Sequence, residues 1–199
     1  MISSKNGTSY CNGEFISIEG RISWGCYYST EGARLYRSCN STVNLVGEST
    51  LEALRKSKEV NAVEGKIMFT DEKRLSEYKK QLEYEMTTYN YKTETALYKN
   101  MMSCSISDDG ERIEISPRFH RKSDIFEGLD AKYNIYISSD SPPEIIGAAL
   151  KFAFTRCKGK GVDVVTKALF PDGTPNSLEG YLESVDPDYG KYLLTAKAT

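Results

Sequence analysis

Two residue types on which enzymes and metal centres often depend are scarce in this sequence. Histidine occurs once in 199 residues, at His120, and the five cysteines include no C-x-x-C pair. Histidine is the commonest general base and zinc ligand, and zinc ribbons need ligands paired about two to four residues apart. His120 also lies in the basic segment 118–122, where positive charge disfavours its protonated form. We therefore expect a surface or loop histidine, no enzymatic activity, no catalytic residues, no metal site and no cofactor.

The sequence also lacks a long hydrophobic run. Its best apolar stretch, 145–154, is interrupted by Lys151 and is shorter than the roughly 18 residues of a membrane span. Residues 1–13 are polar and do not resemble a signal peptide. The cysteines are odd in number and widely spaced, which favours reduced, mostly buried thiols in a cytoplasm; they are Cys11, Cys26, Cys39, Cys104 and Cys157. We expect a cytoplasmic protein that does not enter a membrane.

Length and composition indicate one globular domain. A chain of this length with 39% hydrophobic and 27% charged residues buries enough apolar surface to fold without disulfides or metal. Residues 1–13 contain two glycines and little to bury, which predicts a flexible N-terminal tail before a single domain over residues 14–199. Strand and helix patterns mingle without a regular βαβ repeat. This predicts an α+β fold with a mixed, largely antiparallel sheet and about four helices packed on it.

Four segments carry helical patterns. The first covers residues 51–58 behind the hydroxyls of Ser49 and Thr50, and the second follows Thr70 with a stripe of apolar and aromatic residues; the stripe is Leu75, Tyr78, Leu82, Met86 and Tyr89. The motif S-P-P-E at 141–144 predicts a capping box for the third helix, in which Gly147 indicates close packing against a neighbouring element. The fourth covers residues 178–185. Residues 43–46 and 66–69 favour strands, and D-D-G at 108–110 predicts a hairpin turn.

The net charge of −2 conceals segments of opposite sign. Residues 108–117 hold four acids against one arginine, and residues 177–190 hold four acids and no base. An acidic surface that carries tyrosines suits a basic protein partner, since it mimics nucleic acid. We take as candidate partner-binding residues Asp108, Asp109, Glu111, Glu179, Tyr181, Glu183, Asp186, Asp188 and Tyr189. Ordinary solvated turns and helix ends are the alternative interpretation of these acids.

Basic residues gather in two other segments. Residues 118–122 contain three bases beside Phe119, and residues 151–167 contain five bases against one acid. This composition is typical of a nucleic-acid contact, although the near-neutral total argues against a surface devoted to phosphate. The alternative hypothesis is therefore a small nucleic-acid-binding module, or an uncharacterised cytoplasmic enzyme, that uses residues 118–122 and 151–167.

A series of short motifs from Ile113 to about Val185 resembles a known family. They are I-x-I-S-P-R from Ile113, F-E-G-L from Phe126, Y-N-I-Y-I from Tyr133, the run S-S-D-S-P-P-E-I-I-G-A-A-L-K-F-A-F-T-R-C-K from Ser138, and L-E-G-Y-L-E-S-V from Leu178. Together they resemble the immunity proteins of bacterial contact-dependent growth inhibition systems, the CdiI-type family. Residues 1–68 do not contribute to the resemblance.

The resemblance implies a role without catalysis. Such a protein binds the toxic C-terminal domain delivered by a neighbouring cell and blocks its active site, so the expected partner is a cognate toxin domain, plausibly a nuclease, and neither a nucleic acid nor a membrane. The resemblance supplies no interface residues, because the motifs that carry it have the pattern of core and helix caps.

Overall fold

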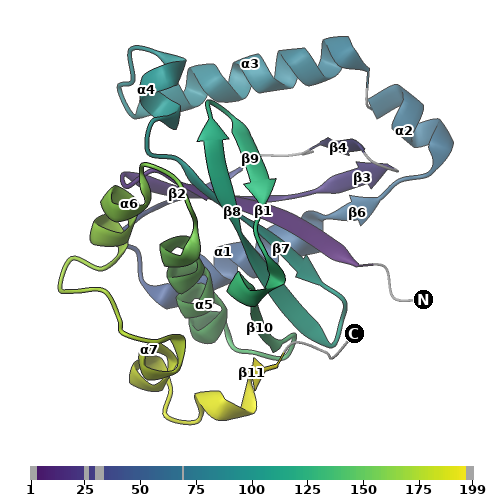
Figure 1. Cartoon of the computed structure of the whole chain (residues 1–199). Helices are drawn as coiled ribbons and strands as arrows, with labels where there is room; N and C mark the ends of the chain where they lie inside the picture. Colours follow the sequence, from purple (N-terminus) through teal and green to yellow (C-terminus); the bar gives the residue numbers. More distant parts are fainter. Residues whose placement is uncertain (1–3, 25–26, 30–33, 69, 196–199) are drawn as a thin grey trace.

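A computed structural model describes residues 4–24, 27–29, 34–68 and 70–195. The described part of the chain contains a large antiparallel sheet with helices against its faces and a small three-stranded sheet beside it (Figure 1). The large sheet has the order β11-β10-β8-β7-β1-β2-β5, and β9 pairs with β8 outside this path. Its strands are β1 (Lys5–Cys11), β2 (Phe15–Gly20), β5 (Leu35–Ser38), β7 (Met102–Asp108), β8 (Arg112–Lys122), β9 (Ile125–Gly128), β10 (Ile135–Ser138) and β11 (Leu193–Leu194).

The small sheet has the order β4-β3-β6 and includes a parallel pair. Its strands are β3 (Ile22–Trp24), β4 (Tyr27–Ser29) and β6 (Lys58–Glu59). The helices of the described residues are α1 (Val43–Lys56), α2 (Ala62–Met68), α3 (Asp71–Thr88), α4 (Glu94–Tyr98), α5 (Pro143–Arg156), α6 (Val162–Leu169) and α7 (Leu178–Val185), with 3-10 turns η1 (Ala131–Tyr133) and η2 (Tyr189–Lys191). None of these helices is both long and apolar enough to cross a membrane.

Helices α1 and α5 cover one face of the large sheet. Helix α1 lies over β1, β2 and β5, and α5 lies over β7, β8 and β10. Side chains alternate between the two faces of a strand, and the apolar members of each strand, such as Ile113 and Ile115 of β8, are buried beneath α5. The predicted α+β class with a mixed, largely antiparallel sheet is confirmed, with three more short helices than the four expected.

A second apolar cluster packs on the other face, at the β2–β5 edge. Phe15 of β2 stacks on Tyr89 with ring centroids 4.2 Å apart, and Leu82 and Met86 of α3 join the same cluster. The predicted stripe of α3 thus contacts the core at its C-terminal end, whereas Leu75 at the other end is half exposed.

The first strand corrects the prediction of a flexible tail over residues 1–13. Residues 5–11 form β1, which lies in the middle of the large sheet between β2 and β7. The sequence K-N-G-T-S-Y-C of β1 is polar for two reasons. One side of the strand faces away from α1 and α5, and on the other side α1 lies so close that small residues, Gly7 and Ser9, fill the space. That residues 14–199 form a single domain stays a prediction.

Three local predictions are wrong at helix boundaries. Residues 43–46, expected in a strand, begin α1, whose cap is Thr42; the hydroxyls of Ser49 and Thr50 instead donate within α1 to the carbonyls of Leu45 and Val46. Residues 66–68 of the second expected strand belong to α2, and residue 69 lies outside the described residues.

The expected capping box at Ser141 is also absent. Helix α5 begins one residue later than expected, with Pro142 at the cap, and the hydroxyl of Ser141 has no hydrogen-bond partner in the described part of the chain. The hairpin turn predicted at 108–110 does join β7 to β8. The helix predicted over residues 178–185 is α7, and the hydroxyl of Ser177 accepts a hydrogen bond from Gly180 N at its start.

Candidate functional site

The two acidic segments of the sequence meet at one end of the large sheet. The β7–β8 turn and the residues after α7 both bond to neighbouring residues at the end of β10. Ser139 N, just after β10, donates to the carbonyl of Glu111 at 3.0 Å, and Ser138 N, in the last residue of β10, donates to that of Tyr192 at 2.8 Å. In Figure 1 this end lies at the bottom, beside β11 and α7. We call the acids gathered here the acidic end; they are Asp109, Glu111, Asp140, Asp186 and Asp188.

Two bases lie beside acids of this group. Lys191 Nζ lies 3.7 Å from Asp188, and Arg112 Nε lies 3.5 Å from Asp109. Glu179 and Glu183 are exposed along α7, so they extend the acidic surface from this end. Of the nine candidate partner-binding residues predicted from the sequence, seven lie on neighbouring turns and helices at this end of the sheet. The side chains of the other two, Asp108 and Tyr181, are engaged in contacts within the protein.

Asp108 is the first of these two. It is only 7% exposed; its Oδ1 accepts hydrogen bonds from Ser139 Oγ at 2.6 Å and Gly110 N at 2.9 Å, and Oδ2 lies 3.7 Å from Lys5 Nζ. Its carboxylate holds the hairpin turn and ties it to the β10–α5 loop. Asp108 is therefore not available to a partner in this conformation.

Tyr181 is the second. Its ring packs edge-on against Phe170, with centroids 5.1 Å apart, and it faces Phe152 of α5. Burial raises the pKa of its hydroxyl. Tyr181 thus helps to hold α7 against α5, whereas Tyr189 lies at the start of η2, half-buried against the edge of the core.

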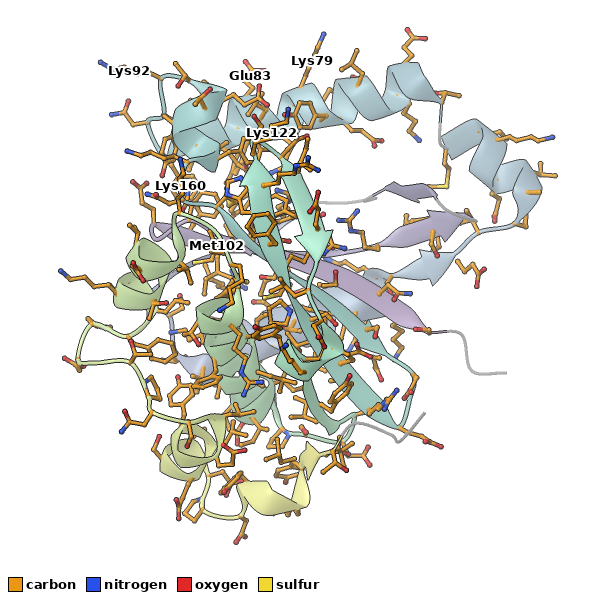
Figure 2. The ribbon with its side chains drawn as sticks, in the orientation of Figure 1. Lys79, Glu83, Lys92, Met102, Lys122 and Lys160 are labelled. Atoms are coloured by element: carbon orange, nitrogen blue, oxygen red, sulfur yellow. The ribbon has the colours of Figure 1, made fainter. Side chains whose placement is uncertain are left out.

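The basic segments come together at the opposite end of the sheet. The backbone of Lys158 bonds to β8 on both sides: its N–H donates to Arg118 O at 3.2 Å, and its carbonyl accepts from His120 N at 2.8 Å. This contact forms one wall of a hollow of about 520 Å³ below α4, whose cations include Lys99, Arg121, Lys122 and Lys160. Figure 2 shows Lys122 and Lys160 at this end of the molecule. We call it the basic hollow.

The other bases of segment 151–167 have different positions. Lys151 is buried, and its Nζ donates to the carbonyls of Cys39 at 3.0 Å and Ser41 at 2.7 Å, so its role is to hold the chain between β5 and α1. Arg156 donates to the carbonyls of Tyr133 and Asn134. Of the bases in this segment, Lys160 lines the basic hollow. Lys158 contributes its backbone there, and its Nζ lies 5.2 Å from the centre of the Tyr133 ring.

His120 has a structural environment. Its Nε2 lies 2.8 Å from the carbonyl of Ser123, and its ring stacks on Phe126 with centroids 4.9 Å apart. Both contacts hold the β8–β9 hairpin together. The position near the end of β8 agrees with the expected surface histidine.

The cysteines of the described chain are free and buried in two pairs. The sulfur atoms of Cys11 and Cys39 are 3.6 Å apart, and those of Cys104 and Cys157 are 3.8 Å apart. Burial raises the pKa of the Cys11 and Cys104 thiols. Cys26 lies outside the described residues. Among those that are described, no three His, Cys, Asp or Glu side chains gather as a metal-binding group.

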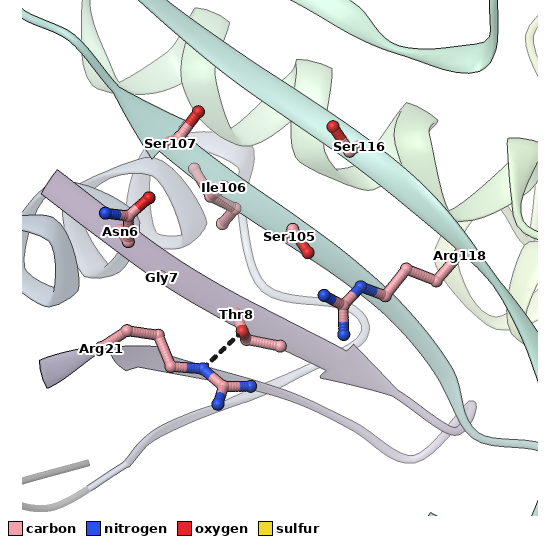
Figure 3. Close-up of a pocket in the computed structure, with 9 residues that line it drawn as sticks. All are labelled: Asn6, Gly7, Thr8, Arg21, Ser105, Ile106, Ser107, Ser116 and Arg118. Carbon is pink, nitrogen blue, oxygen red and sulfur yellow. Dashed lines mark hydrogen bonds between the residues drawn. The ribbon is translucent and has the colours of Figure 1, made fainter. Parts of the chain in front are cut away.

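A polar groove crosses the face of the sheet that α1 and α5 do not cover. The register places Glu19, Thr8, Ser105 and Ser116 side by side across β2, β1, β7 and β8. Arg21 and Arg118 lie on either side of β1 and β7 in this groove, which has a volume of about 330 Å³ (Figure 3). Sequence reasoning did not single out the groove, because its residues share no motif and are joined only by strand pairing.

Comparison with known proteins gives one family match, and it covers most of the chain. The model of the family described as "CdiI: CDI immunity protein" matches residues 5–157. The match therefore begins well before the motifs that carry the resemblance in the sequence and includes β1.

The chain is also similar to one curated relative and to two solved structures. The immunity protein CdiI-YPIII of Yersinia pseudotuberculosis is 45% identical over 76 residues, which cover 37% of this chain and 43% of the relative. A protein of unknown function from Neisseria meningitidis is 27% identical with a TM-score of 0.75, covering 79% of this chain and 98% of the neighbour. A chain of the CdiA-CT/CdiI toxin and immunity complex from Yersinia pseudotuberculosis is 26% identical with a TM-score of 0.72, covering 79% of this chain and 99% of the neighbour.

Proposed function

Because the chain belongs to the family of CDI immunity proteins, we propose that it binds the C-terminal toxin domain of a cognate CdiA protein and neutralises it. The observation that carries the proposal is the family match over residues 5–157. The fold supports it, since a chain of a toxin and immunity complex has the same fold at 26% identity.

The proposed mode of action is inhibition by binding. Neutralisation by binding needs a complementary surface that covers the reactive groups of the toxin, and it requires no bond to be made or broken. We propose that the protein acts as a stoichiometric inhibitor and not as an enzyme. The buried thiols, unpaired by disulfides, suit the reducing cytoplasm of the cell that the protein protects.

The acidic end supports a site for the toxin. Its acids lie on turns that the sheet holds in place through the β10–α5 loop, so the negative charge is presented by a rigid framework. A toxin that binds nucleic acid carries positive charge around its active site, and opposite charge accelerates and orients encounter. We propose that the toxin contacts Asp109, Glu111, Asp186, Asp188 and Tyr189, together with Glu179 and Glu183 along α7.

The test is a titration of the purified protein with the cognate CdiA C-terminal domain. The proposal expects saturable binding and loss of toxin activity once the two proteins are equimolar. A toxin domain that stays active and unbound in excess of this protein would contradict it.

The basic hollow favours a second candidate, binding of single-stranded nucleic acid. Its cations lie beside the exposed ring of Phe119, and such combinations bind a phosphate backbone and stack bases. This candidate predicts binding to RNA without any toxin, weakening steeply as salt rises. A gel-shift titration at low salt that shows no retarded RNA would exclude it.

A further inference from the structure

The centre of the uncovered sheet face is built from small polar side chains. Thr8 of β1 lies between Glu19 of β2 and Ser105 of β7, and Ser105 lies opposite Ser116 of β8. Antiparallel sheets commonly leave one face to solvent, but here short side chains create a depression between longer ones on both sides. The result is a groove with a floor of hydroxyl groups (Figure 3).

Arg21 borders this groove from the end of β2 and is held in a fixed position. Its Nε donates to Thr8 Oγ1 at 2.8 Å, one of its terminal nitrogens lies 3.4 Å from the hydroxyl of Tyr10, and Nε lies 3.7 Å from Glu19. These contacts fix the direction of the guanidinium along β1. The arginine is thus ordered before any ligand arrives.

Arg118 borders the groove from β8 and differs from Arg21 in lacking a partner. Its side chain extends over the sheet toward β1 in Figure 3 and is partly buried. Within the described ranges of the chain, its guanidinium makes no hydrogen bond or ion pair. A guanidinium that is partly removed from water and unpaired gains most from a carboxylate, which it binds through two parallel hydrogen bonds.

The neighbouring acids are already engaged. Arg34 lies 2.6 Å from Glu19 and 2.8 Å from Glu85, so it is paired with both carboxylates near Tyr10. Glu114, on the same face of β8 as Arg118, accepts hydrogen bonds from Ser116 and Asn134. The groove therefore carries one guanidinium charge that its own acids do not offset.

Building on the proposed function, we propose that this groove receives an Asp or Glu side chain of the toxin domain, bound by Arg118 and by Arg21. The groove is continuous with the acidic end, since Ser107, which lines the groove, precedes the β7–β8 turn by a single residue of β7. A toxin domain seated on the acidic end lies against the groove as well. The interface would then hold opposite charges on each side, which fixes the orientation of the partner and excludes toxins without the acidic residue.

A carboxylate suits the groove better than a phosphate. Phosphate sites usually take backbone amides from a helix N-terminus or a glycine-rich turn, whereas the amides of β1, β7 and β8 are used in the sheet ladder. The surplus of one positive charge matches one carboxylate. We therefore commit to a protein side chain as the occupant.

The experiment compares the affinity of the cognate CdiA C-terminal domain for the wild-type protein and for three variants. Arg118→Gln removes the charge, Arg118→Lys keeps it without the planar fork, and Arg121→Gln is a matched control on the same strand, where Arg121 pairs with Glu127 at 2.7 Å away from the groove. Removing one partner of a desolvated charge pair weakens binding strongly, so we expect Arg118→Gln to raise the dissociation constant at least about tenfold. We expect a smaller increase for Arg118→Lys and less than about twofold for Arg121→Gln.

The toxin side is then scanned by replacing each Asp with Asn and each Glu with Gln. One of these replacements should lose its effect when combined with Arg118→Gln, because the two changes remove the same interaction. Circular dichroism and thermal unfolding verify that each variant is folded.

Three outcomes separate the hypotheses. No binding by the wild type contradicts the proposed function itself. Tight binding by the wild type with equal affinities for Arg118→Gln and Arg121→Gln overturns the carboxylate site alone. Binding of inorganic phosphate to the wild type without toxin, abolished by Arg118→Gln, would make the occupant a phosphate and also overturn it.

Discussion

At the scale of single residues, two glycines decide how closely the main helices approach. A Cβ on Gly147 of α5 would lie 1.8 Å from the carbonyl oxygen of Val43, and a Cβ on Gly47 of α1 would lie 1.7 Å from that of Pro143. Backbone therefore packs on backbone where α1 crosses α5. The close packing at Gly147 could be predicted, because this glycine lies inside a predicted helix. The packing at Gly47 could not, because the residues just before it, 43–46, favour a strand.

The first prediction concerns this crossing. Gly147→Ala should lower the free energy of unfolding by about 2–3 kcal/mol, because the methyl group forces α1 and α5 apart and overpacking is of this order. Urea denaturation measures the change. Gly128→Ala is the control, since a Cβ there meets no atom within 4 Å; equal stabilities of the two variants would refute the close approach.

The second prediction concerns pH. Burial, followed by the hydrogen bond to Glu94, raises the pKa of Tyr78 to about 12, and burial with the charge of Glu14 raises the pKa of Tyr91 to about 12. Unfolded tyrosine has a pKa of about 10, so the folded state holds extra protons between these values. The unfolding free energy should therefore fall as pH rises from about 10 to about 12.

Ultraviolet absorbance of tyrosinate follows this titration directly. The native protein should show a late phase near pH 12, and Tyr78→Phe and Tyr91→Phe should each reduce its amplitude. A wild-type titration that is complete near pH 10 would be inconsistent with the burial of these hydroxyls.

At the scale of elements, a buried charge network fastens α3 to the sheet. Arg34, which precedes β5, pairs with Glu85 of α3 and Glu19 of β2, and Glu85 Oε1 also accepts from the hydroxyl of Tyr36 at 2.9 Å. Glu85 is 1% exposed. The charges of α3 are otherwise typical of a solvated face, so Glu85 could not be distinguished from its neighbours by sequence pattern alone.

The third prediction tests this attachment. Arg34→Met should destabilise the protein by about 3–5 kcal/mol, because it leaves two buried carboxylates without their cation. Hydrogen exchange should become faster in α3 before it changes in α5. Lys56→Met, which removes an exposed pair with Glu52 at 2.7 Å, should leave stability unaltered within error; unchanged exchange in α3 of Arg34→Met would count against the network.

The elements predicted wrongly from the sequence share a physical feature, since contacts distant in the chain determine their structure. Residues 43–46 carry two valines, which favour strands, but their contact with α5 stabilises a helix. Polar β1 is stabilised by ladders on both sides, which no local pattern reveals. Helices with their own cap or apolar periodicity, such as α7, were predictable because their signals lie within a few residues.

At the scale of the whole molecule, charge is separated along the sheet. The acidic end surrounds the β7–β8 turn, and the basic hollow lies at the other end of β8, below α4. The acids at the β7–β8 turn and along α7 could be identified from the sequence, since they cluster in two segments. The place where these two acidic segments meet, and the groove between Arg21 and Arg118, depend on strand register. Neither could be predicted from the sequence.

The fourth prediction concerns association with the toxin. Replacing Asp109, Glu111, Asp186 and Asp188 by their amides should lower the association rate by about tenfold at low salt and less at high salt, since steering by surface charge is screened. Stopped-flow mixing with the toxin domain measures the rate. The control replaces Lys99, Lys122 and Lys160 by glutamine; a larger effect of this control would place the toxin at the basic hollow instead.

The central claim is that this immunity protein neutralises a toxin domain by binding it and covering its active site. Calorimetric titration of the cognate CdiA C-terminal domain, paired with an assay of toxin activity on the same mixtures, tests it most directly. The account predicts saturation at equimolar protein and loss of toxin activity in proportion to the complex formed. A toxin domain that releases no heat and retains full activity in excess of this protein would contradict the account.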